Sequence, residues 1–274
     1  MHRFRLVAIA AVAVVGLASV ASAADMPTKM HTKAPVTAPA YSWAGFYVGG
    51  TIGYGWGNQA INFTPDANYA PAFAAGIVPG SIAANPRGIL GGLEYGTNWQ
   101  FQRIVLGTAS DFSFSDINRS QSIFVPVGPG VTTAGEQKLN WLSTSRVRAG
   151  YTVKDDLLVY ATGGLADGGA KASSSVTSTG ACGGGGNCPA GSDSKILWGW
   201  AAGGGVEYGM GHWSAKVEYL HYDLGRLNYN MTDPTSPVPG AFISASTKFS
   251  GDIVRAGVNY RFDWTPWDLL FGRH

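Results

Sequence analysis

The segment WAGFYVGGTIGYGW, residues 43–56, alternates between two kinds of residue. One parity is apolar or aromatic, and the other is mostly glycine. Successive residues of a β-strand point to opposite faces, so a period of two predicts a strand with two unlike faces. The apolar face would comprise Ala44, Phe46, Val48, Ile52, Tyr54 and Trp56, and the opposite face Gly45, Gly49, Thr51, Gly53 and Gly55.

The same period recurs in segments 87–99, 103–116, 139–153, 157–172, 195–210, 213–228 and 247–262. Three connections are short, at 100–102, 154–156 and 211–212. The other four are long and polar, at 57–86, 117–138, 173–194 and 229–246. This alternation puts both ends of the barrel segment on the short-turn side, as in membrane barrels. We therefore predict an all-β fold, an eight-stranded antiparallel transmembrane up-and-down β-barrel over residues 41–262.

The composition agrees with a barrel wall. The chain contains 39 Gly and 33 aromatic residues, and it is 45% hydrophobic but only 13% charged. After the N-terminus no segment offers 18 consecutive apolar residues, which excludes a helical membrane protein. Acids and bases balance outside the first five residues, so nothing indicates nucleic-acid binding. Seven tryptophans are predicted to form interface girdles, namely Trp43, Trp56, Trp99, Trp141, Trp198, Trp200 and Trp213.

The N-terminus has the order of a secretory signal: Arg3 and Arg5, an apolar run over 6–17, then small residues at 21–23. We predict a signal peptide over 1–23, because the run is shorter than the roughly 20 residues that a spanning helix needs. Residues 24–40 are rich in Pro, Lys and Thr and predict a disordered periplasmic leader. A plain linker is expected there, with contact to peptidoglycan as the alternative. Residues 263–274 form a C-terminal tail.

Charged side chains in mid-strand are predicted to face the interior, because Arg or Lys on the lipid face costs about 2–4 kcal/mol at the bilayer midplane. An eight-stranded barrel has an interior that side chains can just fill. Near balance of charge predicts an ion-paired polar core, with a narrow gated conduit as the alternative. The predicted lumen network contains the acids Glu94, Asp111, Glu207 and Glu218 and the bases Arg146, Arg148, Lys216, Arg255 and Arg261.

Other residues with chemical potential were considered. Cys182 and Cys188 flank a glycine-rich pentapeptide, and the oxidising periplasm predicts a local disulfide between them. The glycine clusters lack the ending of a phosphate loop. The histidines lack metal-ligand spacing, so no metal or other cofactor is expected. His221 has no G-x-S-x-G motif to accompany it, and no enzyme is predicted.

The last predicted strand ends in RAGVNYRF, residues 255–262, where Gly257, Tyr260 and Phe262 resemble the C-terminal signal read by the barrel assembly machinery. The chain departs from that signal by continuing for 12 residues beyond the aromatic. With this strand, three segments are similar to the small outer-membrane immunogenic proteins of alphaproteobacteria, namely YSWAGFYVGGTIGYGWG (41–57), WLSTSRVRAGYTVKDDLLVYATGGLA (141–166) and GWAAGGGVEYGMGHWSAKVEYLHYDLG (199–225).

That resemblance implies a barrel of the cell outer membrane that serves as a surface antigen and supports the envelope, with no catalytic residues. Its surroundings would be outer-membrane lipid and lipopolysaccharide. The expected function is structural. The alternatives are a narrow porin that passes small polar solutes and, third, a lipid-modifying outer-membrane enzyme.

Overall fold

The computed structural model describes residues 41–128, 130–178, 188–234, 236 and 238–263. The predicted signal peptide, the leader, Cys182 and all of the tail after residue 263 lie outside these residues. Within them the fold consists of ten strands and one short helix. In chain order these are β1 (Gly45–Trp56), β2 (Ala60–Pro65), α1 (Ala70–Ala74), β3 (Ser81–Ala83), β4 (Arg87–Phe101), β5 (Ile104–Val125), β6 (Val131–Lys154), β7 (Leu157–Ser178), β8 (Ala190–Met210), β9 (Trp213–Thr232) and β10 (Phe242–Arg261).

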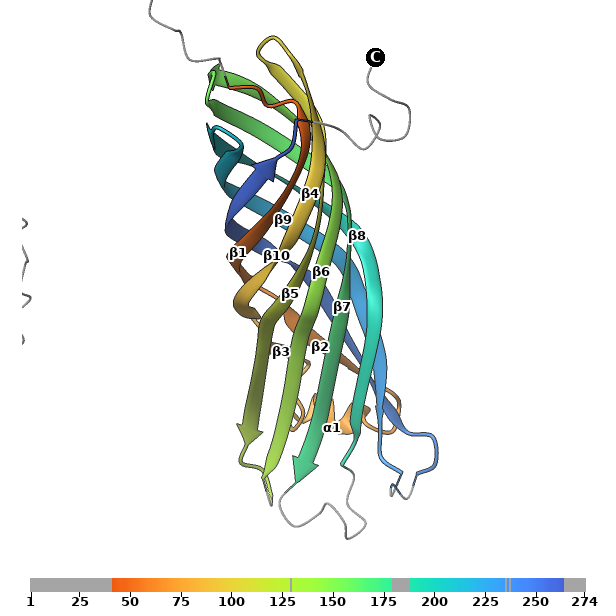
Figure 1. Ribbon diagram of the computed structural model, residues 1–274. Coiled ribbons are helices and arrows are strands. Elements are labelled where there is room, and N and C mark those ends of the chain that lie inside the picture. The colour runs from red at the N-terminus through yellow and green to blue at the C-terminus, as the bar shows by residue number, and fades with distance from the viewer. Residues whose placement is uncertain (1–40, 129, 179–187, 235, 237, 264–274) are drawn as a thin grey trace, which may run out of the picture. The chain divides into compact units, whose positions relative to one another are not determined.

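Eight of these strands close into a ring (Figure 1). β1 pairs with β4, the strands from β4 to β10 pair in chain order, and β10 pairs back with β1. All of these pairings are antiparallel. The predicted eight-stranded up-and-down barrel is confirmed. A closed ring satisfies the backbone of every wall strand, which is the condition for strands in lipid.

The wall strands are longer than predicted at the end that carries the long connections. β5 continues to Val125 and β6 begins at Val131, so most of the predicted loop 117–138 is strand. The loops predicted at 173–194 and 229–246 are shortened in the same way. The prediction was wrong because these extensions are rich in Ser, Thr and Asn. A polar strand pairs well where both faces lie outside the bilayer, yet its composition resembles that of a loop.

The predicted loop 57–86 also contains structure. β1 pairs with β10 over residues 252–261, and β2 pairs with β10 over residues 243–247, so β2 follows the same strand beyond the end of β1. β3 pairs with β2 as a hairpin. Buried side chains of this segment, including Ile61, Phe63 and Ile82, pack among inward residues of β6, β7, β9 and β10. The first long connection therefore fills the outer end of the barrel.

Asp66 attaches this inserted segment to the wall. Its carboxylate accepts the backbone N–H of Asn68 and Tyr69 at 3.0 Å, and that of Phe242 in β10 at 3.3 Å. Loss of hydration raises the pKa of Asp66, but hydrogen bonds from the Asn68 side chain and these backbone groups outweigh it and hold the pKa below its usual value. The attachment therefore favours the ionised carboxylate.

Among the described residues, buried apolar side chains form two clusters in the barrel. The larger one combines the inserted segment with inward residues of the outer half, such as Leu227 and Met231. The smaller one lies near the short turns and contains Trp43, Val105, Leu158 and Tyr160. Trp43 was wrongly placed in a girdle: it is 1% exposed, and its indole Nε1 donates to the Asp155 carbonyl at 3.0 Å. Trp141 is half-buried, whereas the outward tryptophans Trp56, Trp99, Trp198, Trp200 and Trp213 are 39% to 69% exposed.

The glycines on the inner face of β1 make room for long side chains of β10. A Cβ atom at Gly49 would lie 1.9 Å from Asn259 Oδ1, and one at Gly53 would lie 2.6 Å from Arg255 Cβ. This close approach explains why glycine occupies most inward positions of segment 43–56. Small residues on one strand are matched by large polar residues on its neighbour.

We expect Gly49→Ala to destabilise the barrel by about 1–3 kcal/mol, because the added methyl group overpacks the seam between β1 and β10. Gly50→Ala is the matched control, since Gly50 faces outward and its Cβ would lie no closer than 3.8 Å to the Gly92 carbonyl oxygen. Urea unfolding in lipid vesicles, followed by tryptophan fluorescence, measures both. Equal stability of the two variants would contradict this account of the glycine face.

Candidate functional site

The structure places eight of the nine residues of the predicted lumen network inside the barrel. Each is at most 4% exposed, and they are Glu94, Asp111, Arg146, Arg148, Glu207, Lys216, Glu218 and Arg255. The ninth, Arg261, lies at the short-turn end, where its guanidinium donates to Asp263 at 2.8 Å and to the Ala44 carbonyl at 3.2 Å. Arg261 therefore does not join the central network.

Two acids and two arginines form the centre of the network. Glu218 receives hydrogen bonds from Arg146 at 3.1 Å and from Arg255 Nε at 2.7 Å. Asp111 receives them from Arg146 at 2.8 Å and from Arg255 at 3.0 Å. Each arginine therefore bridges both acids. The four residues come from β5, β6, β9 and β10, so the cluster joins the walls across the lumen.

Two further ion pairs flank this centre. Lys216 Nζ lies 2.5 Å from Glu94 Oε2, and Arg148 lies 2.8 Å from Glu207. The Arg148 guanidinium also stands 4.5 Å from the centre of the Tyr160 ring, a cation–π contact. Ser214 donates its hydroxyl hydrogen bond to Glu207. Both pairs thus compensate their buried charges, and Glu207 is additionally hydrogen-bonded, which helps to offset the loss of hydration.

The strand register explains part of this arrangement. Arg255 lies directly opposite Glu218, and Lys216 lies directly opposite Glu207. Glu94 lies directly opposite Asp111, a pair of like charges that would destabilise the sheet by itself. Bases from β9 and β10 compensate these acids across the lumen. Such contacts depend on closure of the barrel and have no signal in the local sequence.

Several neutral residues complete the network, and sequence reasoning did not select them. The Thr144 hydroxyl donates to Asp111 at 2.6 Å, and the Tyr160 hydroxyl donates to Glu218 at 3.0 Å. Asn259 donates to Glu207 at 3.2 Å. The sequence feature that could have identified them is the alternation of inward and outward positions, because each occupies an inward position of its strand. Parity alone does not separate a hydrogen-bonding partner from a filler of space.

The remaining predicted positions are peripheral. Cys188 lies among the described residues, where its backbone N–H donates to Asp233 at 2.6 Å. Its predicted partner Cys182 lies outside the described residues, so the disulfide stays a prediction. Of the proposed assembly signal, Gly257 and Tyr260 lie in β10, and the Phe262 ring stacks at 6.0 Å on Phe46 next to that strand. These contacts build an aromatic edge at the short-turn end, and a role in assembly stays a prediction.

His221 has an acidic partner that the sequence did not indicate. Its Nδ1 lies 2.8 Å from Asp252, which also accepts the Tyr219 hydroxyl at 2.6 Å. All three residues are on the outer surface of β9 and β10, and the register brings Asp252 opposite His221. Across the described ranges, no serine or threonine hydroxyl hydrogen-bonds to His221 or Asp252.

Two general findings concern the described part of the chain alone. No helix there has the length and apolarity to cross a membrane. The same residues contain no group of three or more His, Cys, Asp or Glu side chains placed to hold a metal ion.

The outer surface of the ring is apolar around its middle. Exposed side chains there include Ile52, Leu93, Val147, Leu165 and Val217, each between 59% and 74% exposed. In water this belt would be unfavourable, whereas in lipid it is the expected outer face of a barrel. The charged network lies inside the ring at the inward positions of the same strands.

Comparisons with known proteins agree with this architecture. The family described as "Outer membrane protein beta-barrel domain" matches residues 10–262. The 31 kDa outer-membrane immunogenic protein of Brucella melitensis is 33% identical over 260 residues, which cover 89% of this chain and 95% of that protein. The 25 kDa outer-membrane immunogenic protein of Brucella abortus is 27% identical, covering 96% of this chain and 100% of that protein.

A third relative, the 22 kDa outer membrane protein of Rhizobium leguminosarum bv. viciae, is 28% identical over 84% of this chain and 82% of its own length. Among solved structures, the outer membrane protein OprG of Pseudomonas aeruginosa covers 81% of this chain and 98% of that chain, with 10% identity and a TM-score of 0.49. The sequence relatives confirm the expected resemblance and the location in the outer membrane. The chain belongs to the outer-membrane β-barrel protein family that includes the alphaproteobacterial outer-membrane immunogenic proteins.

Proposed function

We propose that this protein is a closed barrel that stabilises the cell envelope and presents its outer end as a surface antigen. The observation that carries the proposal is the layering of the lumen. A charged layer, paired around Glu218 and Asp111, lies between the apolar cluster near the short turns and the larger cluster at the outer end. Relatives named as immunogenic outer-membrane proteins support the antigen role.

The layering opposes conduction for a physical reason. Leu158 below the charges and Met231 and Ile243 above them are each 0% exposed. A hydrated ion on the lumen axis would have to lose water against these side chains, and hydrophobic constrictions of this kind close pores by dewetting. It would then have to compete with ion pairs that are already formed. Both steps favour a static polar core over a narrow porin.

The proposal also excludes an enzyme that modifies lipid. Such an enzyme needs an activated nucleophile or a positioned acid and base. His221 and Asp252 form the acid–histidine pair described above, but their hydroxyl neighbour is Tyr219, whose hydroxyl donates a hydrogen bond to Asp252. This arrangement holds the strands together at the outer surface and leaves no serine in the position of a nucleophile among the described residues.

We expect the mature protein, refolded in a planar bilayer, to show no steady single-channel conductance. A heat-dependent shift in gel migration must show in parallel that the same sample is folded. Reproducible channels that disappear when lumen charges such as Arg146 are replaced would overturn the closed barrel and establish the narrow porin. Channels that are indifferent to those charges would instead indicate leakage around the protein.

A further inference from the structure

The outer wall of β5 to β8 carries ordered rows of polar side chains beyond the lipid belt. The extended strands pair without interruption there, so the register defines each row. These positions alternate with buried ones such as Gln137 and Ala172 and therefore face outward. From the membrane outward, the rows are Asn118, Lys138, Lys171 and Ser194, then Ser120, Glu136, Ser173 and Ser192, then Ser122, Ala134, Ser175 and Ala190.

The first row places two like charges side by side. Lys138 of β6 lies directly opposite Lys171 of β7. Across the described ranges neither lysine has an ion-pair partner. Directly opposed like charges destabilise a sheet, and both lysines are at outward positions of the wall. This geometry fits an anion held between them.

The level of this lysine pair is set by its neighbours on the membrane side. The Trp141 indole covers Gly169, since a Cβ at Gly169 would lie 2.4 Å from Trp141 Nε1. Ile196, opposite Gly169, and Trp198 are 59% and 69% exposed. Exposed tryptophans mark the boundary between acyl chains and headgroups. Lys138 and Lys171 therefore lie at the headgroup level of the outer leaflet.

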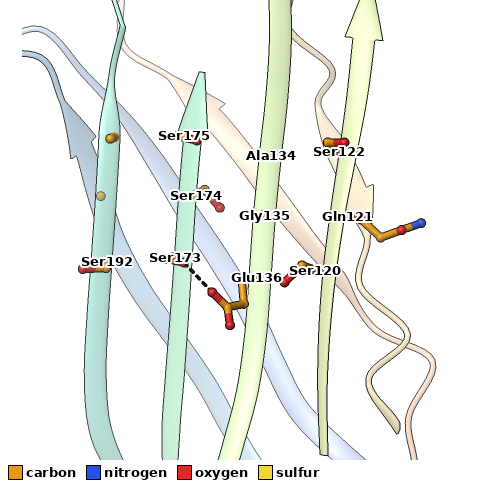
Figure 2. Close-up of a pocket in the computed structure, with 12 residues that line it drawn as sticks. Ser120, Gln121, Ser122, Ala134, Gly135, Glu136, Ser173, Ser174, Ser175 and Ser192 are labelled. Atoms are coloured by element: carbon orange, nitrogen blue, oxygen red, sulfur yellow. Dashed lines mark hydrogen bonds between the residues drawn. The ribbon is translucent and has the colours of Figure 1, made fainter. Parts of the chain in front are cut away.

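A hydroxyl-rich depression of about 770 Å³ begins one row further out. Figure 2 shows Ser120, Glu136, Ser173 and Ser192 side by side along it. Glu136 accepts a hydrogen bond from Ser173 at 3.5 Å, and the exposed residues Ser120 and Ser192 also line the depression. Serine hydroxyls and a carboxylate supply both donors and acceptors, which is the chemistry that sugar hydroxyls require.

We propose that this outer face of β5 to β8 binds a phosphorylated glycolipid of the outer leaflet. Its acyl chains would lie along Ile196 and Trp198, a phosphate between Lys138 and Lys171, and a sugar in the serine-lined depression. The order apolar, cationic, hydroxyl matches the order of groups in such a lipid. The position directly above the apolar belt selects a lipid phosphate over a free one. This inference does not depend on whether the lumen conducts.

The test titrates the refolded mature protein in detergent with bisphosphorylated lipid A, followed by native mass spectrometry. Replacing both lysines with glutamine (K138Q/K171Q) is expected to weaken binding about 30-fold at low salt. Each lysine near an anionic surface strengthens binding by about fivefold, and the two contributions multiply. The double arginine variant, K138R/K171R, should retain binding. K154Q is the matched control, since Lys154 is an exposed lysine at the other end of β6.

Two further probes separate the sources of phosphate. Lipid A without phosphates should bind wild type and K138Q/K171Q equally weakly. Millimolar inorganic phosphate should not displace the bisphosphorylated lipid. Undiminished binding by K138Q/K171Q would overturn the site, and displacement by inorganic phosphate would overturn its assignment to a lipid. Heat-dependent gel migration confirms that each variant is folded before it is titrated.

Discussion

Replacing Glu218 with alanine is expected to lower the free energy of unfolding by about 3–5 kcal/mol, the range found when one partner of a buried ion pair is removed. Glu218 accepts from Arg146, Arg255 and the Tyr160 hydroxyl, and all of these groups are buried. Asp111 would then be left as the acid that hydrogen-bonds to both arginines, with Glu94 3.9 Å from Arg255. The measurement is urea unfolding in lipid vesicles, with tryptophan fluorescence as the signal.

Glu136→Ala is the control for that experiment, because Glu136 is on the outer wall and makes one long hydrogen bond to Ser173. Its effect should stay within about 0.5 kcal/mol, as is usual for surface substitutions. Glu218→Gln keeps the side-chain shape and provides a folded comparison if the alanine variant does not assemble. Equal stability of the Glu218→Ala and Glu136→Ala variants would show that water already compensates the arginines, and that the lumen is more hydrated than the ion pairs indicate.

Replacing Ile61 with alanine is expected to cost about 2–5 kcal/mol, the range for emptying a buried isoleucine site. Ile61 is 0% exposed at the start of the inserted hairpin, and its Cδ1 atom would be 2.7 Å from a Cβ at Gly135 on β6. It therefore reaches from the segment after β1 to a wall strand that is not its neighbour. The same unfolding measurement applies.

Ile123→Ala removes the same atoms from a position near the outer end of β5 that is 38% exposed, and it should cost less because the loss scales with the buried area. A small effect at Ile61, equal to that at Ile123, would mean that the hairpin is not packed into the barrel in the membrane. In that case the closed upper layer of the proposed function would also fail. The two variants together therefore test the inserted segment and its contribution to closure.

Segment 43–56 shows how far the sequence determined the fold. Its period of two defined a strand with one lipid face, and the same parity placed Arg146, Glu207 and Arg255 inside, because a charge on the lipid side is costly. Short turns such as Gly211–His212 established the up-and-down order. These features are local or repeat at a fixed spacing, so no knowledge of tertiary contacts was needed.

Only the tertiary structure decided how those parts combine. Glu94 meets Lys216 from a strand 122 residues away, and Ile61 packs across the lumen, because ring closure brings distant strands together. Trp43 points inward, although its place at a strand end predicted a girdle, because its side chain packs into the lumen at the short-turn end. The polar part of β6 that precedes Leu139 in the chain likewise forms a strand because it pairs with β5 and β7. Such pairing depends on the partner strands and cannot be detected from hydrophobic periodicity.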